Sequence, residues 1–122
     1  MSLYESGEMY LESILILTRE KSDVRAIDLC EYMSYSKPSV SRALSNLKKS
    51  GHVSVDENGH ISLTNDGIAV AEKIYERHNI LSTVLQMIGV SEETASEDAC
   101  KIEHDISDES FEAIKRLVTK NQ

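Results

Sequence analysis

The sequence predicts a mostly α-helical fold in which a winged helix-turn-helix precedes a purely helical segment. Two short helical patterns flank the turn Ser34-Tyr35-Ser36, and a hairpin pattern follows them. Three further helical patterns with polar cap residues fill the chain after the hairpin. This order of helices, turn and two-stranded wing is typical of a winged helix-turn-helix. We therefore divide the chain into domains of residues 1–63 and 64–122.

Two helices are predicted ahead of the turn. Residues 4–20 carry an apolar stripe at helical spacing. Residues 26–33 form a shorter helix, which is expected to turn Ile27, Leu29, Cys30 and Met33 inward.

The helix after the turn has clear boundary signals. Ser36 is a suitable N-cap, and Pro38 falls in the first turn, where a missing N–H costs nothing. Gly51 is placed to end the helix. The inward stripe follows the spacing i, i+3, i+4, i+7 and consists of Val40, Ala43, Leu44 and Leu47.

The wing is predicted from two alternating runs, Val53–Asp56 and His60–Leu63. Between them lies Asn58-Gly59, and Asn-Gly between alternating runs is the strongest short-range hairpin signal. The two runs should therefore pair as antiparallel strands.

The remainder of the chain is predicted to be helical. Thr64 or Asn65 caps a long helix to about residue 88, a second helix runs from Ser91 to about Asp105, and a third begins at Ser107. These helices exceed what a lone winged helix needs. An apolar, acidic helical appendage is most simply a dimerisation unit.

The formal net charge of −8 argues at first against a nucleic-acid-binding protein. The charge is unevenly distributed, however: residues 1–63 have a net charge of −2 and residues 64–122 one of −6. Residues 32–55 contain no acidic residue but four bases, which are Lys37, Arg42, Lys48 and Lys49. This basic window coincides with the helix after the turn.

That helix is the candidate recognition helix, which this motif places in the major groove of DNA. Arginine and asparagine read guanine and adenine edges, and lysine pairs with phosphates. The predicted DNA-contacting residues are Ser36, Lys37, Pro38, Ser39, Arg42, Asn46 and Lys49. The alternative is an ordinary solvated helix of a protein-interaction domain.

A possible metal site comes from sulfur, carboxylate and imidazole donors at helical spacing. Cys100, Glu103 and His104 lie at i, i+3, i+4, which places them on one helix face. Met9 and Glu12 are one turn apart on the first helix. A further donor, His78, falls inside the apolar stripe of the long helix. Each group alone is more often core or solvated surface, but together they offer six ligands from three helices.

Three motifs resemble those of the DtxR/MntR family of metal-dependent transcriptional repressors, named for the diphtheria toxin repressor and the manganese transport regulator. Glu8–Leu11 resembles the first-helix motif, and Lys37–Ser41 resembles the start of the recognition helix. Asp98–His104, followed by Ser107–Glu109, resembles the metal motif of the second domain. The resemblance covers essentially the whole chain.

The resemblance implies a homodimer whose metal-filled form binds a palindromic operator and represses metal-uptake genes. Residues 1–63 would bind DNA, and residues 64–122 would bind metal and dimerise. No SH3-like third domain is expected, as in the short members. The expected location is the cytoplasm, because no signal peptide or membrane span is visible.

By position, the ligand set that the resemblance implies combines residues of the iron-type and the manganese-type members. The primary site of the iron-type members matches Met9, Cys100, Glu103 and His104, with Cys100 binding through its sulfur or its carbonyl. Glu12 and His78 match positions that the manganese-type members use. Ser82 and Ser96 stand where the second site of the iron type has a glutamate and a histidine, so that site is expected to be incomplete.

The expected cofactor is a divalent transition metal, with Fe²⁺ favoured and Mn²⁺ as the alternative. Manganese binds weakly and prefers oxygen ligands, whereas Met9 supplies a thioether where a manganese site would have a carboxylate. The second hypothesis for the function is a winged-helix regulator that does not respond to metal. A metalloenzyme is the third, but no pair of nucleophile and base suggests itself, so no enzymatic activity is expected.

Overall fold

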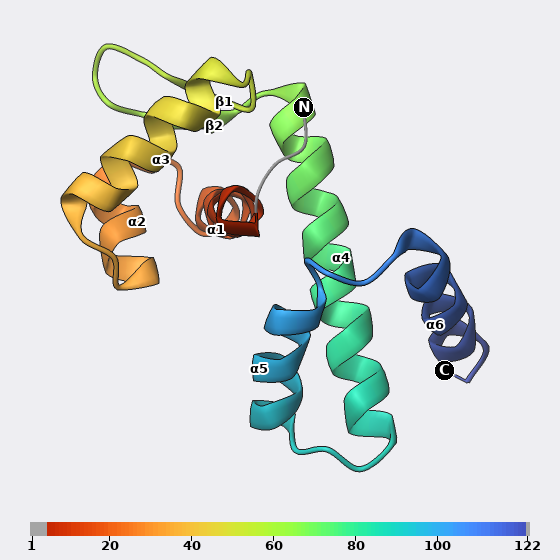
Figure 1. Ribbon diagram of the computed structural model, residues 1–122. Coiled ribbons are helices and arrows are strands. Elements are labelled where there is room, and N and C mark those ends of the chain that lie inside the picture. Colours follow the sequence, from red (N-terminus) through yellow and green to blue (C-terminus); the bar gives the residue numbers. More distant parts are fainter. Residues whose placement is uncertain (1–4, 122) are drawn as a thin grey trace. The chain divides into compact units, whose positions relative to one another are not determined.

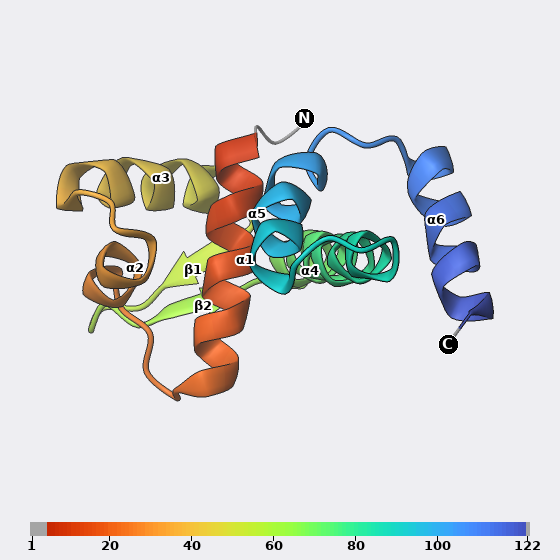
Figure 2. The same ribbon diagram turned by 90° about the horizontal axis from the view of Figure 1, so that it is seen from below.

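The computed structural model describes residues 5–121, so Tyr4, within the first predicted helix, lies outside the described residues. Within this range the chain forms six helices and one two-stranded sheet (Figures 1 and 2). In chain order the elements are α1 (Glu5–Glu20), α2 (Ala26–Met33), α3 (Lys37–Lys49), β1 (Val53–Val55), β2 (Ile61–Leu63), α4 (Asn65–Met87), α5 (Glu92–Ile102) and α6 (Asp108–Lys120). The predicted fold class is confirmed. The chain clusters into two compact units, Met1–Glu72 and Lys73–Gln122.

The helix-turn-helix consists of α2 and α3. Ser34 adopts a left-handed conformation, with φ of 59°, and so ends α2. Ser36 then caps α3 by accepting the N–H of Ser39 at 3.3 Å. The prediction for Ile27 is wrong, because 58% of this residue is exposed. The prediction for Leu29 is confirmed, because this residue is completely buried. Positions two apart on a helix face in nearly opposite directions, so Ile27 and Leu29 do not share a face.

The wing is the antiparallel pair of β1 and β2, with Val53 opposite Leu63 and Val55 opposite Ile61. Each strand is one residue shorter than predicted. The reason is that Asp56 and His60 belong to the turn, where the Asp56 carboxylate accepts the N–H groups of Asn58 and His60, each at 2.9 Å.

The first unit has its core around α1, which contacts α2, α3 and β2 (Figure 1). Leu11 and Ile14 of α1 are completely buried. The buried apolar residues from the other elements of this unit include Val24, Leu29, Val40, Leu44, Leu47, Val53 and Ile61. Burial of these side chains provides the main stabilisation of the helix-turn-helix and fixes the orientation of α3.

The start of α4 packs tightly on the wing. Thr64 caps the helix by accepting the N–H of Gly67 at 3.1 Å, which decides between the two predicted cap residues. Gly67 is required by a close approach: a Cβ at this position would overlap the carbonyl oxygen of His52 and lie 3.3 Å from the side chain of Leu63. Only glycine therefore fits at this position.

In the second unit, α5 and α6 lie on different sides of α4, and Lys115 of α6 donates to Glu76 of α4 (Figure 2). Ser91 and Ser107 cap α5 and α6, as the sequence predicts. The prediction that α5 runs to about Asp105 is wrong, because the helix ends at Ile102. The N–H groups of Asp105 and Ile106 both donate to the carbonyl of Ile102 and close the last turn. Within the described chain, no helix is long and apolar enough to cross a membrane.

Candidate metal centre and nucleic-acid interface

Glu103 is the centre of the candidate metal site. It is the C-cap residue of α5, and its N–H donates to the carbonyl of Ala99 at 2.9 Å. Its side chain is completely buried, with Oε2 2.9 Å from Nδ1 of His78 and Oε1 3.3 Å from Nε2 of His104. A carboxylate that is removed from water must be balanced by neighbouring charges or hydrogen bonds.

His78 lies in the middle of α4 with its side chain 25% exposed. Its second ring nitrogen, Nε2, is 3.4 Å from the hydroxyl of Ser96 on α5. The imidazole therefore lies between a carboxylate and a hydroxyl. Ser96 is one of the two serines that, by the resemblance, stand where the second site of the iron type has metal ligands.

The donor set in this unit fits a divalent transition ion. It offers one carboxylate and two imidazoles, which are ligands that zinc, iron and manganese use. Oε1 of Glu103 is buried and accepts no hydrogen bond from the described residues. A cation at this point would satisfy it.

The six predicted ligands are divided between the two units. His78, Cys100, Glu103 and His104 belong to the second unit, where the structure brings His78, Glu103 and His104 together. The half-buried Cys100 lies on α5, one turn before His104. Met9 and Glu12 lie one turn apart on α1 in the first unit, and both are partly buried.

Arg77 is a buried residue of this region that the sequence reasoning missed. It is only 5% exposed and directly precedes His78 on α4. Its guanidinium donates to the carbonyl oxygens of Glu103, at 3.2 Å, and Ile106, at 2.8 Å. No local pattern distinguishes it, because arginines on a helix are usually exposed.

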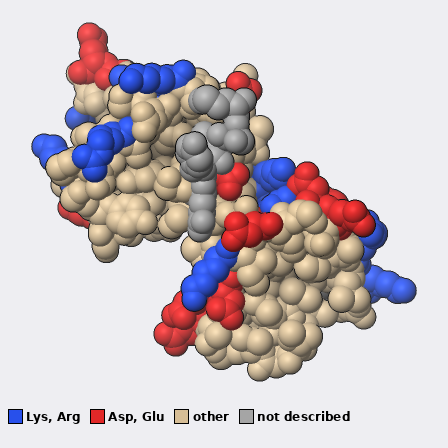
Figure 3. Space-filling view, viewed as in Figure 1, with Lys and Arg blue, Asp and Glu red and all other residues tan. Residues whose placement is uncertain are grey.

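The outer face of α3 is the candidate nucleic-acid interface. Lys37, Arg42, Asn46 and Lys49 are all exposed, whereas the inward stripe is buried at Val40, Leu44 and Leu47 and partly buried at Ala43. Figure 3 shows basic side chains spaced over the part of the first unit that contains α3. Ser36 and Ser39 lie in the first turn, which contains no acid, and a helix N-terminus of this kind favours a phosphate.

A second arginine, Arg25, fastens the tip of the wing. Its Nη1 donates to the carbonyl of Asn58 at 2.6 Å, and its Nη2 lies 2.8 Å from Nε2 of His60. Asp23 accepts from its Nε at 3.2 Å. The loop before α2 therefore holds the hairpin, and the sequence offered no signal for this contact.

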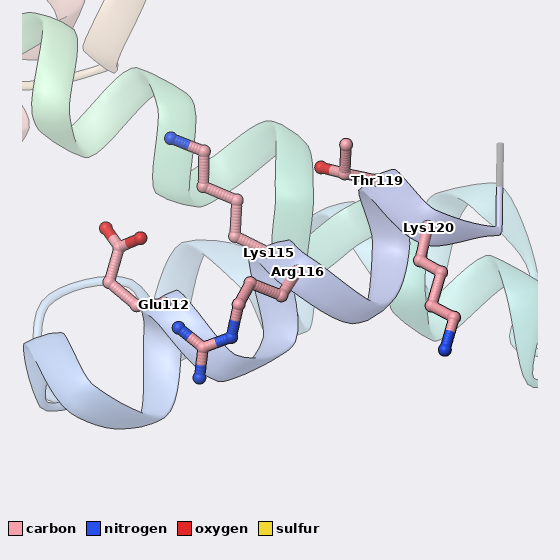
Figure 4. A pocket seen from close by; sticks show the side chains of 5 residues that line it. All are labelled: Glu112, Lys115, Arg116, Thr119 and Lys120. Carbon is pink, nitrogen blue, oxygen red and sulfur yellow. The ribbon is translucent and has the colours of Figure 1, made fainter.

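A shallow depression on α6 is lined by Glu112, Lys115, Arg116, Thr119 and Lys120 (Figure 4). Lys115 extends from it and donates to Glu76 of α4 at 3.0 Å. No buried residue lines the depression, and we assign it no ligand.

Two family models together match nearly the whole chain. Residues 2–61 match the N-terminal DNA-binding domain of the iron-dependent repressors, and residues 64–122 match their metal-binding and dimerisation domain. The chain belongs to the iron-dependent repressor family. The resemblance to metal-dependent repressors is thereby confirmed.

Curated relatives of this repressor share about a third of its residues. An uncharacterized helix-turn-helix-type transcriptional regulator of Methanocaldococcus jannaschii is 33% identical, over 95% of this chain and 94% of that protein. The transcriptional regulator MntR of Escherichia coli O157:H7 is 32% identical, over 92% of this chain and 72% of that protein.

Solved structures share the fold of this chain. A structure described as IdeR of T. acidophilum has a TM-score of 0.79 and 25% identity, over 96% of this chain and 55% of that chain. The manganese regulator SloR has a TM-score of 0.82 and 24% identity, over 98% of this chain and 55% of that chain. The chain therefore spans about half the length of these solved relatives.

Proposed function

We propose that this protein is a metal-dependent transcriptional repressor in which a divalent ion in the helical unit controls operator binding by α3. The observation that carries the proposal is the buried carboxylate of Glu103 between the imidazoles of His78 and His104. The same chain carries a helix-turn-helix with an exposed basic helix. Both features agree with the two family domains that the chain matches.

The metal would be held by His78, Glu103 and His104, and we propose that Met9, Glu12 and Cys100 complete the ligand set. The ion would supply positive charge that the buried carboxylate otherwise lacks. Because the ligands would come from both units, binding would restrict their relative motion. Such an effect shifts a population of conformations rather than building a new fold.

On DNA, we propose that Arg42 and Asn46 face the bases. Lys37 and Lys49 would pair with phosphates, and the helix start at residues 36–39 would orient α3. The family dimerises through its C-terminal domain, so two copies of α3 would read a palindromic operator. Their spacing would be about one DNA turn, roughly 34 Å, or a multiple of it. The proposed targets are metal-uptake genes, regulated in the cytoplasm.

For the metal itself we propose Fe²⁺, with Mn²⁺ as the alternative. The thioether of Met9 and the thiol of Cys100 favour softer or later ions than Mn²⁺. Glu12 and Glu103 are hard ligands that Mn²⁺ also accepts, and for this reason manganese is the alternative.

The decisive experiment is a mobility shift with the DNA upstream of the protein's own gene. Binding should appear with Fe²⁺ under anaerobic conditions or with Mn²⁺, and chelator should remove it. Binding that chelator leaves unchanged would instead support a metal-independent winged-helix regulator. Metal-dependent turnover without DNA affinity would support an enzyme.

A further inference from the structure

The end of α5 is held by the side chain of Arg77 from the neighbouring helix. Its Nη1 donates to the carbonyl oxygens of Glu103 and Ile106, at 3.2 and 2.8 Å, and its Nη2 donates to the carboxylate of Asp108. The guanidinium carbon also lies 5.3 Å from the ring centroid of Phe111. The charged group therefore spans the whole turn between α5 and α6.

This arrangement has an electrostatic reason. Carbonyl groups at the end of a helix lack partners within the helix and carry a partial negative charge, which a nearby cation stabilises. The flat fork of a guanidinium has several N–H groups and so serves several acceptors at once, which a lysine ammonium on a flexible stem does less well. Arg77 thereby donates to one buried and one partly buried carbonyl of this turn.

The arginine acts on the backbone of the residues that carry the donor groups. Glu103 provides the buried carboxylate and the neighbouring His104 an imidazole. Arg77 binds the carbonyl of the peptide bond that links these two residues. On α4, Arg77 directly precedes His78, whose Nδ1 is 2.9 Å from the same carboxylate. One short stretch of α4 therefore supplies a donor and also fixes the turn that supplies the other two.

We propose that Arg77 is a positioning residue of the metal centre, which sets the place of Glu103 and His104 relative to His78. The inference rests on the proposed metal binding. Groups that orient metal ligands typically change metal affinity by 10- to 100-fold when they are replaced. We expect an effect of that size for Arg77, although its side chain is not a ligand.

A purely structural role, the attachment of α6 to α4, is the competing explanation. Asp108→Asn distinguishes the positioning role of Arg77 from this structural role. The substitution weakens the ion pair between Asp108 and Arg77 but leaves the two bonds from Arg77 to carbonyl oxygens in place. Lys115→Met is a matched control, because it breaks the exposed contact with Glu76 that also joins α6 to α4. Asp108 pairs with Lys73 and Arg77, and Lys115 pairs with Glu76.

The experiment titrates the full chain with Co²⁺ in the absence of DNA. Calorimetry gives the affinity, and the visible absorption of bound Co²⁺ reports the ligand geometry. Arg77→Lys should weaken Co²⁺ binding at least tenfold and change the absorption band. Asp108→Asn and Lys115→Met should stay within about twofold of wild type, with an unchanged spectrum.

Two results would overturn the inference: wild-type affinity and spectrum in Arg77→Lys, or an equal loss in Asp108→Asn. If Arg77→Lys lacks the wild-type helical circular dichroism, Arg77→Gln, which keeps one N–H donor group, is read by the same two measurements. The wild-type chain is titrated first. If it binds none of Co²⁺, Fe²⁺ and Mn²⁺, the proposed function itself is overturned; if it binds them, the variants test only the role of Arg77.

Discussion

Oε2 of Glu103 lies 2.9 Å from Nδ1 of His78, although 25 residues separate them in the chain. The carboxylate comes from the turn after α5, and the imidazole comes from the middle of α4. A buried carboxylate in contact with a partly exposed imidazole leaves the site negative when the imidazole is neutral.

Glu103→Gln should weaken the binding of Co²⁺ by at least 100-fold and leave the fold intact. The amide has the shape of the carboxylate and can still bond to His78, but it lacks the charge that attracts a cation. Calorimetric titration measures the binding, and thermal unfolding checks the fold. Glu97→Gln, at an exposed position of α5, is the control and should bind like wild type. Equal affinity in Glu103→Gln would remove Glu103 from the site.

Lys49→Ala should lower operator affinity for all sequences alike. If Lys49 contacts a phosphate, its loss reduces the slope of log K against log salt by about 0.9. The measurement is a series of binding isotherms at several salt concentrations. Lys101→Ala removes the same charge from the second unit and should leave the slope unchanged. A changed sequence preference with an unchanged slope would mean that Lys49 reads a base.

Arg42→Ala should relax the preference for one base pair in each half-site. The loss of a bidentate base contact costs about 1–3 kcal/mol of discrimination. Selection of bound sequences from a randomised operator measures this effect position by position. Uniform weakening with an unchanged selected sequence would place Arg42 on the backbone of the DNA instead.

Met9→Asp, alone and combined with Cys100→Glu, should increase the response to Mn²⁺. Each change replaces a sulfur donor by a carboxylate, which manganese prefers. Operator binding titrated with Mn²⁺ and with anaerobic Fe²⁺ gives the two responses. Met87→Asp, at a methionine that is 46% exposed, is the control for a new carboxylate elsewhere. A wild-type response to low micromolar Mn²⁺ as strong as that to Fe²⁺ would contradict the iron proposal.

The wing should loosen in acid because of Asp56. The N–H of His60, together with that of Asn58, holds the pKa of this carboxyl below its ordinary value of 3.8. A lowered folded-state pKa means that the stabilisation is complete above the ordinary pKa and disappears as the pH falls through the lower, folded-state value. The amide NMR signals of Asn58 and His60 should therefore titrate together below pH 3.8.

The same titration in Asp56→Asn provides the comparison, because the amide keeps an acceptor oxygen but has no charge to lose. Its two amide signals should stay constant over this pH range. Glu57→Gln, at the exposed neighbouring position, should titrate like wild type. Independent titration of the two amides in the wild-type chain would show that Asp56 does not hold the turn.

Elements that depend on local chemistry were predictable from the sequence. Ser36 caps α3 because a serine hydroxyl reaches an N–H three residues ahead, and this needs no tertiary partner. Gly59 turns the hairpin at a φ of 85°, a conformation that glycine adopts without strain. The helix-turn-helix and its wing followed from such signals.

The end of α5 was not predictable, because Glu103, His104 and Asp105 are all compatible with a helix. The structure ends the helix where the carbonyl of Glu103 finds a tertiary donor in Arg77. A contact between residues 77 and 103 cannot be predicted from the sequence pattern around either residue. The sequence spacing predicted a shared helix face for Cys100, Glu103 and His104, and the structure brings Glu103 and His104 together, with Oε1 and Nε2 3.3 Å apart, just beyond the end of the helix. The spacing predicted neither the burial of Glu103 nor the buried arginine that binds its carbonyl.

The close approach of Gly67 to the carbonyl of His52 has a consequence for the tolerance of this protein to mutation. In a library that varies every position, we expect position 67 to accept glycine and little else, although it lies in neither the candidate metal site nor the candidate DNA-contacting face. Even alanine would press the start of α4 away from the wing. A scan for loss of repression would therefore select this position alongside functional ones, and only a stability measurement would separate them.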